Sequence, residues 1–330
     1  MSTYLELVCP AGTPAALRAA VDAGADTVYC GFRDATNARN YPGLNFDPDE
    51  LAEGVQYAHK RGCKVLVAVN TFPRAGDPGP WHRAVDNAAA CGADAVILAD
   101  LGMLDYTARR HPQLRRHLSV QASAASPQAI RFYRETFGIA RVVLPRVLSV
   151  DEVRSLIDQI PIEAEVFAFG SVGTMVEGRC FISSYLTGCS PSMDGACAPA
   201  AHVSYREEDG RLVTRLDDVI MNRFEEDEAG AYPTPCKGRF LVRGRPMYLF
   251  EEPVALNVVP LLRELKEAGV TALKIEGRQR SRAYVGQVVA FRKILDAAAA
   301  GETLPTAVAE LRAVAEGQRE TFGAYAKGWR

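Results

Sequence analysis

Short apolar segments alternate with amphipathic segments through the first 170 residues of this chain of 330 residues. Most of the apolar segments are rich in valine and apolar on both faces, which is typical of strands buried in a parallel sheet. These segments are Leu5–Cys9, Asp26–Cys30, Lys64–Asn70, Asp94–Ala99, Leu118–Gln121, Arg141–Leu144 and Ala164–Phe169. Helical patterns lie between them, at Thr13–Ala23, Pro48–Arg61, Gly79–Ala90 and Val150–Ile157. This alternation predicts parallel strands joined by helical crossovers.

A recurring phrase marks the junctions where a helix ends and a strand begins. It reads Ala-Gly-Ala-Asp at 23–26, Cys-Gly-Ala-Asp at 91–94 and Glu-Ala-Gly-Val at 267–270. Each copy has the glycine that ends many helices, followed directly by an apolar run. The third precedes Thr271–Glu276, which we expect to be the eighth strand. The sequence therefore predicts an α/β fold of the (β/α)8 TIM-barrel type.

Two further patterns bear on where helices begin and end. Ser149 and Glu152 have the spacing of a capping box, which predicts that a helix begins directly after Ser149. The segment Ser281–Ala299 is also predicted to be helical.

A long insertion separates the seventh and eighth predicted strands. Roughly 100 residues intervene, where connections of a few residues are usual. We expect the barrel to comprise residues 1–170 and 265–330, and residues 171–264 to form a cysteine-rich insertion. Strand-like segments occur in it at Val203–Arg206, Leu212–Leu216 and Met247–Phe250. A long insertion at the end of a barrel strand is usually functional.

The charge and the N-terminal sequence limit the possible classes of protein. Lys and Arg number 38 against 40 Asp and Glu, a formal net charge of -2, so no basic excess argues for nucleic acid. The N-terminus lacks the basic start and apolar run of a signal peptide, and no uninterrupted run of about 18 apolar residues predicts a transmembrane helix. We therefore expect a cytoplasmic protein whose thiols stay reduced.

Four of the eight cysteines lie in polar, turn-rich sequence beside Gly or Pro: Cys180, Cys189, Cys197 and Cys236. Thiolates are favoured ligands of iron–sulfur clusters and structural zinc. No pair has the C-x2-C spacing of a zinc ribbon or ferredoxin run, and only His202 is near enough in sequence to suggest a mixed ligand set. On spacing alone, a metal site and four unrelated buried thiols are equally supported. The other four cysteines have apolar neighbours and are expected in the core: Cys9, Cys30, Cys63 and Cys91.

Polar residues follow the predicted strands at their carboxyl ends, where a barrel builds its site. The candidates for catalysis or binding are Asn37, Arg39, Asn70, Gln121, Arg146, Lys274, Glu276 and Arg278. Arginine binds carboxylates through paired hydrogen bonds, and a carboxylate beside cations is a candidate acid or base. For each residue alone, the alternative is a satisfied polar side chain at the barrel rim.

Longer phrases across nearly the whole chain resemble the peptidase U32 (collagenase-like) family. They are Leu-Val-Cys-Pro-Ala-Gly at 7–12, Thr-Asn-Ala-Arg at 36–39, Gly-Leu-Asn-Phe at 43–46, Ser-Val-Gln-Ala-Ser at 119–123, Arg-Val-Val-Leu-Pro-Arg-Val-Leu-Ser at 141–149, Glu-Gly-Arg-Cys at 177–180, Ser-Ser-Tyr-Leu-Thr-Gly at 183–188, Gly-Ala-Cys at 195–197, Pro-Thr-Pro-Cys-Lys-Gly-Arg at 233–239 and Lys-Ile-Glu-Gly-Arg-Gln-Arg-Ser at 274–281. The longest are similar to the branch that acts in oxygen-independent ubiquinone biosynthesis, whereas Lys-Ile-Glu-Gly-Arg alone marks the wider family.

The resemblance implies a [4Fe–4S] cluster on four cysteines and a heterodimer with a related UbiV-like protein. It implies that the pair hydroxylates the ring of a ubiquinone precursor without molecular oxygen, with a dicarboxylate such as prephenate as oxygen donor. A lipid-carrier accessory protein is a further expected partner. Other branches hydroxylate transfer or ribosomal RNA, so an RNA-modifying enzyme is an alternative. A peptidase and a non-enzymatic scaffold are two more.

One position departs from the family pattern. The first cluster cysteine is expected in Phe-Gly-Ser-Val-Gly-Thr-Met, where this chain has Gly173, while Cys180, Cys197 and Cys236 match the other three ligands. We expect Cys189 to serve as the fourth ligand; the alternatives are an open iron that binds a small molecule, or a degenerate site. The five histidines are predicted in helices or loops, which weighs against the Cys–His pair that a thiol peptidase needs.

Overall fold

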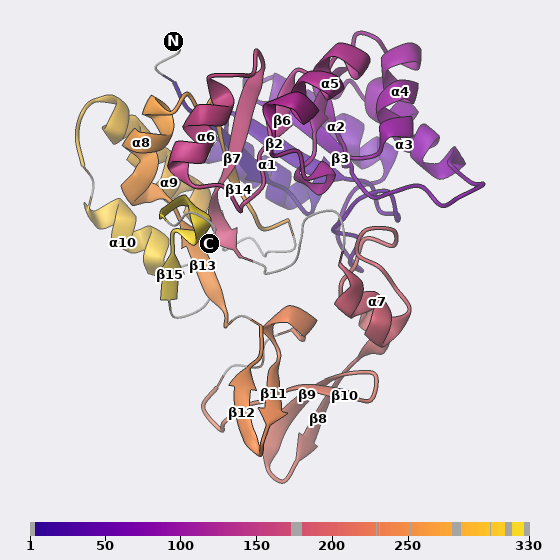
Figure 1. The fold of residues 1–330 in the computed structure, drawn as a ribbon, viewed down its shortest axis with the longest axis vertical. Helices are drawn as coiled ribbons and strands as arrows, with labels where there is room; N and C mark the ends of the chain where they lie inside the picture. The colour runs from indigo at the N-terminus through magenta and orange to yellow at the C-terminus, as the bar shows by residue number, and fades with distance from the viewer. Residues whose placement is uncertain are drawn as a thin grey trace.

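Eight parallel strands close into a barrel in the computed structural model, which describes residues 4–172, 180–228, 230, 232–250, 252–278, 285–303, 305–313 and 319–326. The strands are β1 (Glu6–Pro10), β2 (Thr27–Gly31), β3 (Lys64–Val69), β4 (Ala95–Leu98), β5 (Arg115–Leu118), β6 (Arg141–Val143), β7 (Glu163–Ser171) and β14 (Ala272–Ile275). Neighbours pair in this order, and β14 closes the barrel by pairing with both β1 and β7. The predicted α/β barrel is confirmed (Figure 1).

Helices cover the outside of the barrel and bury their apolar faces against it. They are α1 (Pro14–Asp22), α2 (Pro48–His59), α3 (Gly79–Ala90), α4 (Leu101–Arg110), α5 (Pro127–Phe137), α6 (Val150–Ile157), α8 (Leu262–Glu267), α9 (Val285–Ala299) and α10 (Pro305–Ala313). The predicted capping box of Ser149 and Glu152 is confirmed, since the Ser149 hydroxyl accepts from the Glu152 N–H and the Glu152 carboxylate accepts from the Ser149 N–H. The predicted helix from residue 281 is confirmed over α9; residues 281–284 lie outside the described residues.

The position predicted for the fifth strand is wrong. The sequence predicted Leu118–Gln121, whereas β5 is Arg115–Leu118 and a 3-10 turn occupies Val120–Ala122. The Ser119 hydroxyl accepts from the Gln121 N–H at 3.2 Å and so ends the strand. β5 is polar: Arg115 pairs with Glu163, and the Arg116 guanidinium donates to the Leu114 and Phe137 carbonyls. This polarity hid the strand from a search for apolar runs. β5 also places His117 in a strand, which corrects the expectation of helix or loop for every histidine.

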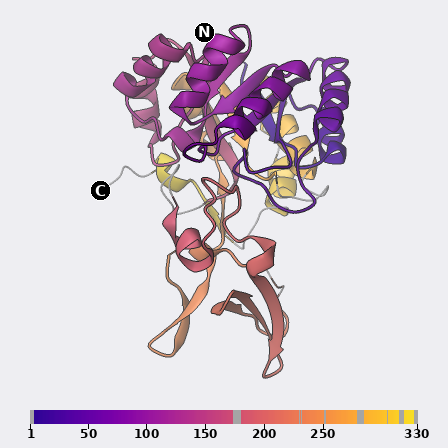
Figure 2. The ribbon, with the colours of Figure 1, turned by 90° about the vertical axis from the view of Figure 1, so that its right-hand side faces the viewer.

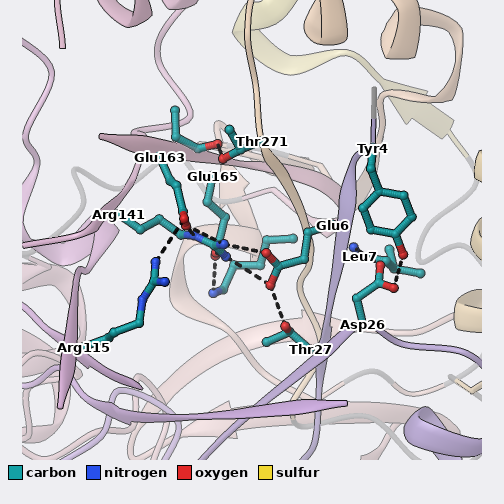
Figure 3. A network of polar contacts seen from close by, with 12 residues as sticks. Tyr4, Glu6, Leu7, Asp26, Thr27, Arg115, Arg141, Glu163, Glu165 and Thr271 are labelled. Atoms are coloured by element: carbon teal, nitrogen blue, oxygen red, sulfur yellow. Dashed lines mark hydrogen bonds and ion pairs between the residues drawn. The ribbon is translucent and has the colours of Figure 1, made fainter. Parts of the chain in front are cut away.

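The barrel interior has an apolar half and a charged half. The apolar half is a cluster of inward side chains: Val8, Tyr29, Leu66, Ala68, Ala95, Ile97 and Ala272. In the charged half, the Arg141 guanidinium lies 2.5 Å from the Glu6 carboxylate, 2.7 Å from Glu163 and 3.1 Å from Glu165 (Figure 3). Lys274 Nζ lies 2.6 Å from the other oxygen of Glu165. Buried charges persist in a core when they are paired in this way.

The chain leaves the barrel after β7 and forms a separate part that we call the lobe, residues 180–250 (Figures 1 and 2). It holds α7 (Phe181–Thr187), an antiparallel sheet of β8 (Val203–Glu208), β9 (Arg211–Leu216) and β10 (Val219–Arg223), and a hairpin of β11 (Arg239–Val242) and β12 (Arg245–Tyr248). All three strand-like segments expected in the insertion fall on or overlap strands, namely β8, β9 and β12.

The chain returns to the barrel through β13 (Val254–Asn257), which pairs antiparallel with β7. β15 (Arg319–Thr321) then pairs parallel with β13 and extends the sheet beyond the closed barrel. Thus β13 belongs to the barrel sheet although it lies within the 171–264 range expected for the insertion. Among the helices of the described residues, none combines the length and apolar character needed to span a membrane.

The Arg141 cluster yields a stability prediction. Replacing Arg141 by Met removes a partner of Glu165, whose side chain is fully buried, and leaves that carboxylate with Lys274 alone. We expect a loss of about 3–5 kcal/mol in the free energy of unfolding, the usual result of breaking a buried ion pair. Urea unfolding followed by circular dichroism measures it. Arg109→Ala, on the exposed surface of α4, is the matched control and should cost nothing measurable. Equal stability of the two variants would contradict the prediction.

Candidate functional site

A pocket lies at the carboxyl end of the barrel strands, and seven of the eight polar candidates from the sequence line it: Arg39, Asn70, Gln121, Arg146, Lys274, Glu276 and Arg278. The eighth, Asn37, is buried behind the pocket wall. Tyr29, Ser119 and Phe167 also line the pocket but were not singled out from the sequence. Tyr29 and Phe167 lie within apolar strands, and only their inward register on β2 and β7 would have indicated them.

Glu276, directly after β14, holds two arginines in place. Its carboxylate forms ion pairs with Arg39, at 2.5 Å, and with Arg146. Burial alone would raise the pKa of Glu276, but Arg146 and Arg39 outweigh it and hold the pKa at about 2. A carboxylate with so low a pKa is a poor proton acceptor near neutral pH. Glu276 therefore fixes the two guanidinium groups at the pocket.

Arg146 and Lys274 also contact aromatic walls of the pocket. The Arg146 guanidinium lies 3.5 Å from the Phe167 ring centroid, and Lys274 Nζ lies 4.0 Å from that of Tyr29. Such cation–π contacts stabilise a desolvated cation and fix its position. Burial lowers the pKa of Lys274, although Glu165 beside it partly offsets this effect.

Arg278 is a pocket cation with unused hydrogen-bonding capacity. Its side chain is buried, and within the described part of the chain its Nη1 has no hydrogen-bond partner. Burial lowers its pKa to about 10, so the guanidinium still carries its charge near neutral pH. A Cβ on Gly31 would stand 2.6 Å from this Nη1, so only glycine leaves the guanidinium room at the end of β2. A buried, unsatisfied N–H group beside a pocket is what an anionic ligand would satisfy.

The three amide candidates fix the loops around the pocket. Asn37 Oδ1 accepts from the Arg39 N–H at 3.0 Å, and its Nδ2 donates to the Phe32 carbonyl, so Asn37 positions Arg39. Asn70 accepts from the Ala38 N–H at 3.0 Å and donates to the Ser119 hydroxyl at 3.2 Å. Asn70 thus joins the loops that follow β2 and β5. Gln121 lies in the 3-10 turn after β5 with its side chain at the pocket.

Two lobe cysteines, Cys180 and Cys197, lie near a third, Cys236. Burial, together with the nearby Cys197 and Cys180 thiols, raises the pKa of Cys236 to about 11. Cys189 has a different neighbour: its Sγ lies 4.0 Å from His202 Nε2, and His202 Nδ1 lies 2.9 Å from the Asp217 carboxylate. Gly173 lies outside the described residues.

The donor set bears on which cofactor these cysteines fit. No group of three His, Cys, Asp or Glu side chains in the described ranges is tight enough to surround one metal ion. A cluster binds each thiolate through a different iron, so its ligands stand farther apart than those of a single ion. Three neighbouring thiols that do not converge on one point are compatible with a cluster and do not fit a mononuclear site.

The cysteine-bearing loop packs directly against the pocket rim. The Asn40 N–H donates to the Gly195 carbonyl at 3.1 Å, and the Phe72 N–H donates to the Ser192 carbonyl at 2.8 Å. Arg74 pairs with Asp194 at 2.8 Å. Gly195 has φ = 85°, and a Cβ there would stand 2.3 Å from the Asn37 carbonyl oxygen, so this approach requires glycine. The loops after β2 and β3 therefore hold the segment 192–195, which lies just before Cys197, against the pocket rim.

Glu276 yields a pH-dependent prediction. Its pKa falls on folding from the usual 4.5, so its ion pairs stabilise the fold fully above about pH 4.5 and progressively less as the pH falls towards 2. We expect Glu276→Gln to lower the free energy of unfolding by about 2–3 kcal/mol at pH 7, since two partly buried guanidinium groups lose their partner. In thermal unfolding, the stability lost by the variant relative to the unsubstituted protein should be constant from pH 7 to pH 5.5 and smaller at pH 3.5. Glu267→Gln, exposed on α8, is the control, and a deficit that grows with acidity would contradict the assignment.

Comparisons with known proteins agree with this architecture. The family model described as "Peptidase family U32" matches residues 12–328. The tRNA hydroxylation protein P of Escherichia coli (strain K12) is 31% identical over 325 residues, covering 92% of this chain and 71% of that protein. The tRNA hydroxylation protein P1 of Bacillus subtilis (strain 168) is 31% identical, covering 88% of this chain and 63% of the relative. The 23S rRNA 5-hydroxycytidine C2501 synthase of Escherichia coli (strain K12) is 28% identical, and the match covers 90% of this chain and 40% of that protein.

The family match extends over every barrel strand except β1 and over the lobe, so it includes the pocket and all four lobe cysteines. Together with the identity to the first relative over most of both chains, this match decides the family. The chain belongs to the peptidase U32 family.

Proposed function

We propose that this chain is an iron–sulfur protein with a UbiU-like role, acting as a subunit of a complex that hydroxylates the ubiquinone ring without molecular oxygen. Relatives named for the hydroxylation of tRNA and rRNA support hydroxylation as the reaction class. The long phrases around Arg141–Ser149 and Pro233–Arg239 support the ubiquinone branch as the substrate class.

The position of Arg39 carries the proposal. Burial lowers the pKa of Arg39, but Glu276, Tyr41 and Cys197 nearby outweigh it and raise the pKa above its ordinary value. The Arg39 guanidinium contacts a pocket carboxylate, and Tyr41 Oη, from the same loop, lies 3.1 Å from the sulfur of a lobe cysteine, Cys197. A cofactor held by that cysteine would stand beside whatever the pocket binds. Redox proteins need this proximity between cofactor and substrate.

We propose that Cys180, Cys197 and Cys236 hold a [4Fe–4S] cluster. When bound, such a cluster supplies one-electron chemistry and, at an iron without a protein ligand, a Lewis acid. The protein's own contribution is to place the pocket beside it. Arg278, with an unused N–H group, is suited to bind an anionic group of the oxygen donor, a dicarboxylate such as prephenate. Lys274 supplies a second cation, and both Lys274 and Arg278 lie over the Tyr29 ring, at 4.0 Å and 5.7 Å from its centroid.

The proposed complex includes a UbiV-like partner as heterodimer and a lipid-carrier accessory protein that delivers the ubiquinone precursor. Exposed aromatic side chains on α7 support a contact with another protein. Phe181 is 73% exposed and Tyr185 is 91% exposed, although both are large and apolar. Aromatic side chains are enriched in protein interfaces, where their burial contributes strongly to binding.

Hydroxylation of RNA is the second candidate, and the names of the relatives favour it. The β11–β12 hairpin also presents Arg243 and Arg245 at its turn. The near-neutral charge of the chain weighs against RNA, because neutralisation of phosphates supplies much of RNA affinity.

Peptide hydrolysis is the third candidate. A relative from Porphyromonas gingivalis (strain ATCC BAA-308 / W83) is named "Collagenase". The order Cys189, His202, Asp217 has the contacts of a nucleophile, a base and a residue that orients the base. However, Cys189 follows the carboxyl end of α7, where the helix dipole disfavours a thiolate.

The role of Arg278 can be tested in cells. Cells that depend on this gene for anaerobic ubiquinone should lose about tenfold or more of their anaerobic ubiquinone when they carry Arg278→Met, because a charged hydrogen bond to the donor is lost. Arg109→Met on the surface of α4 is the control. Quinone content and hydroxylated nucleosides are measured by mass spectrometry in the same cells. Loss of hydroxylated nucleosides with unchanged ubiquinone would favour the RNA alternative.

The ligand set can be tested by iron and sulfide analysis after anaerobic reconstitution. Cys236→Ser should lose most of both elements, while Cys91→Ser, outside the lobe, should lose neither. Cys189→Ser tests the expectation from the sequence that Cys189 is the fourth ligand. We expect it to retain both elements, because the thiol of Cys189 contacts His202. A loss as large as that of Cys236→Ser would instead identify Cys189 as the fourth ligand.

A further inference from the structure

The loop after β2 brings a tyrosine hydroxyl to one of the lobe cysteines. Tyr41 Oη lies 3.1 Å from Cys197 Sγ, within hydrogen-bond range for sulfur. Tyr41 is only two residues from Arg39, whose guanidinium reaches the pocket. The two side chains of one loop thus contact the cysteine group and the pocket.

The hydroxyl of Tyr41 is held by packing on both sides of the contact. The rings of Tyr41 and Tyr232 meet edge to face, with centroids 6.3 Å apart at 83°. The Tyr232 hydroxyl donates to the Ala198 carbonyl at 2.6 Å, and the Ser183 hydroxyl donates to the Cys197 carbonyl. The Cys197 carbonyl is therefore held by Ser183, while the Tyr41 hydroxyl contacts the Cys197 sulfur and also interacts with the Cys197 backbone N–H.

The direction of this hydrogen bond follows from the state of the cysteine. A thiol or a hydroxyl could donate, but a cysteine that ligates iron is a thiolate and has no proton. With a ligated Cys197, only the tyrosine can donate. A hydrogen bond to a ligand sulfur draws electron density from it and favours the reduced cluster, which carries more negative charge.

We propose that Tyr41 sets the reduction potential of the cluster by donating a hydrogen bond to the Cys197 thiolate. This inference rests on the proposed function, since it requires a cluster on Cys197. Tyr41 acts through the ligand and not on the substrate, so it is a positioning residue. It couples the loop that carries the pocket arginine to the electron affinity of the cofactor.

The test is a redox titration of the anaerobically reconstituted full chain, followed by electron paramagnetic resonance. Tyr41→Phe removes the hydroxyl and keeps the ring, so iron and sulfide content should match the unsubstituted protein. We expect the midpoint potential to fall. If the midpoint potential of a one-electron couple falls by about 59 mV, the ratio of oxidised to reduced cluster at a fixed potential rises tenfold. Tyr232→Phe is the matched control, because it removes a neighbouring hydroxyl that bonds a carbonyl instead of the sulfur.

Each outcome decides a separate point. An unchanged potential in Tyr41→Phe with full iron content overturns the inference and leaves the proposed function standing. An equal shift in Tyr232→Phe also overturns it, because the effect would then come from packing. Absence of iron and sulfide from the unsubstituted protein overturns the proposed function and the inference together. A shift confined to Tyr41→Phe supports the inference.

Discussion

Glu165 is the residue on which barrel closure depends. It lies on β7 with no exposed surface, and it pairs with Arg141 from β6 and with Lys274 from β14. The strands β7 and β14 lie next to each other in the barrel although the whole lobe separates them in sequence. Two cations from the strands on either side of β7 therefore converge on one buried carboxylate across this junction. The same lysine reaches the pocket, so the charge that closes the barrel also contributes to its site.

The sequence predicted the parts of the fold that rest on local patterns. Strands apolar on both faces, such as β3, and helices with strong caps, such as α6, were found close to their true positions. β5 was misplaced because Arg115 and His117 are polar; Arg115 pairs with Glu163 of β7, and His117 is buried near charges such as Arg141. Those charges come from elsewhere in the chain, and no local pattern reveals such pairing.

The site shows the same division. In a barrel of this type, the functional site lies at the carboxyl ends of the strands. This rule depends on topology alone, and it identified seven pocket residues from the sequence. The rule gave no roles. The roles depend on burial and on hydrogen-bond partners. Glu276 immobilises two arginines, Asn37 positions Arg39, and Arg278 keeps an unused N–H group. Likewise the spacing of the cysteines could not separate Cys189 from the other three, since its contact with His202 arises only when the lobe folds.

The lobe begins and ends at one place. Ser171 at the end of β7 and Ala255 in β13 are directly paired in the barrel sheet. The barrel sheet thus holds together the two ends of the segment that contains the lobe. Contacts within the lobe therefore do not have to offset the entropy cost of bringing these ends together. Lengthening or replacing the lobe changes that closure entropy only slowly, as the logarithm of its length. Such an anchor lets the lobe diverge in sequence and size over evolution while the barrel stays intact, a route by which one scaffold could come to serve different substrates.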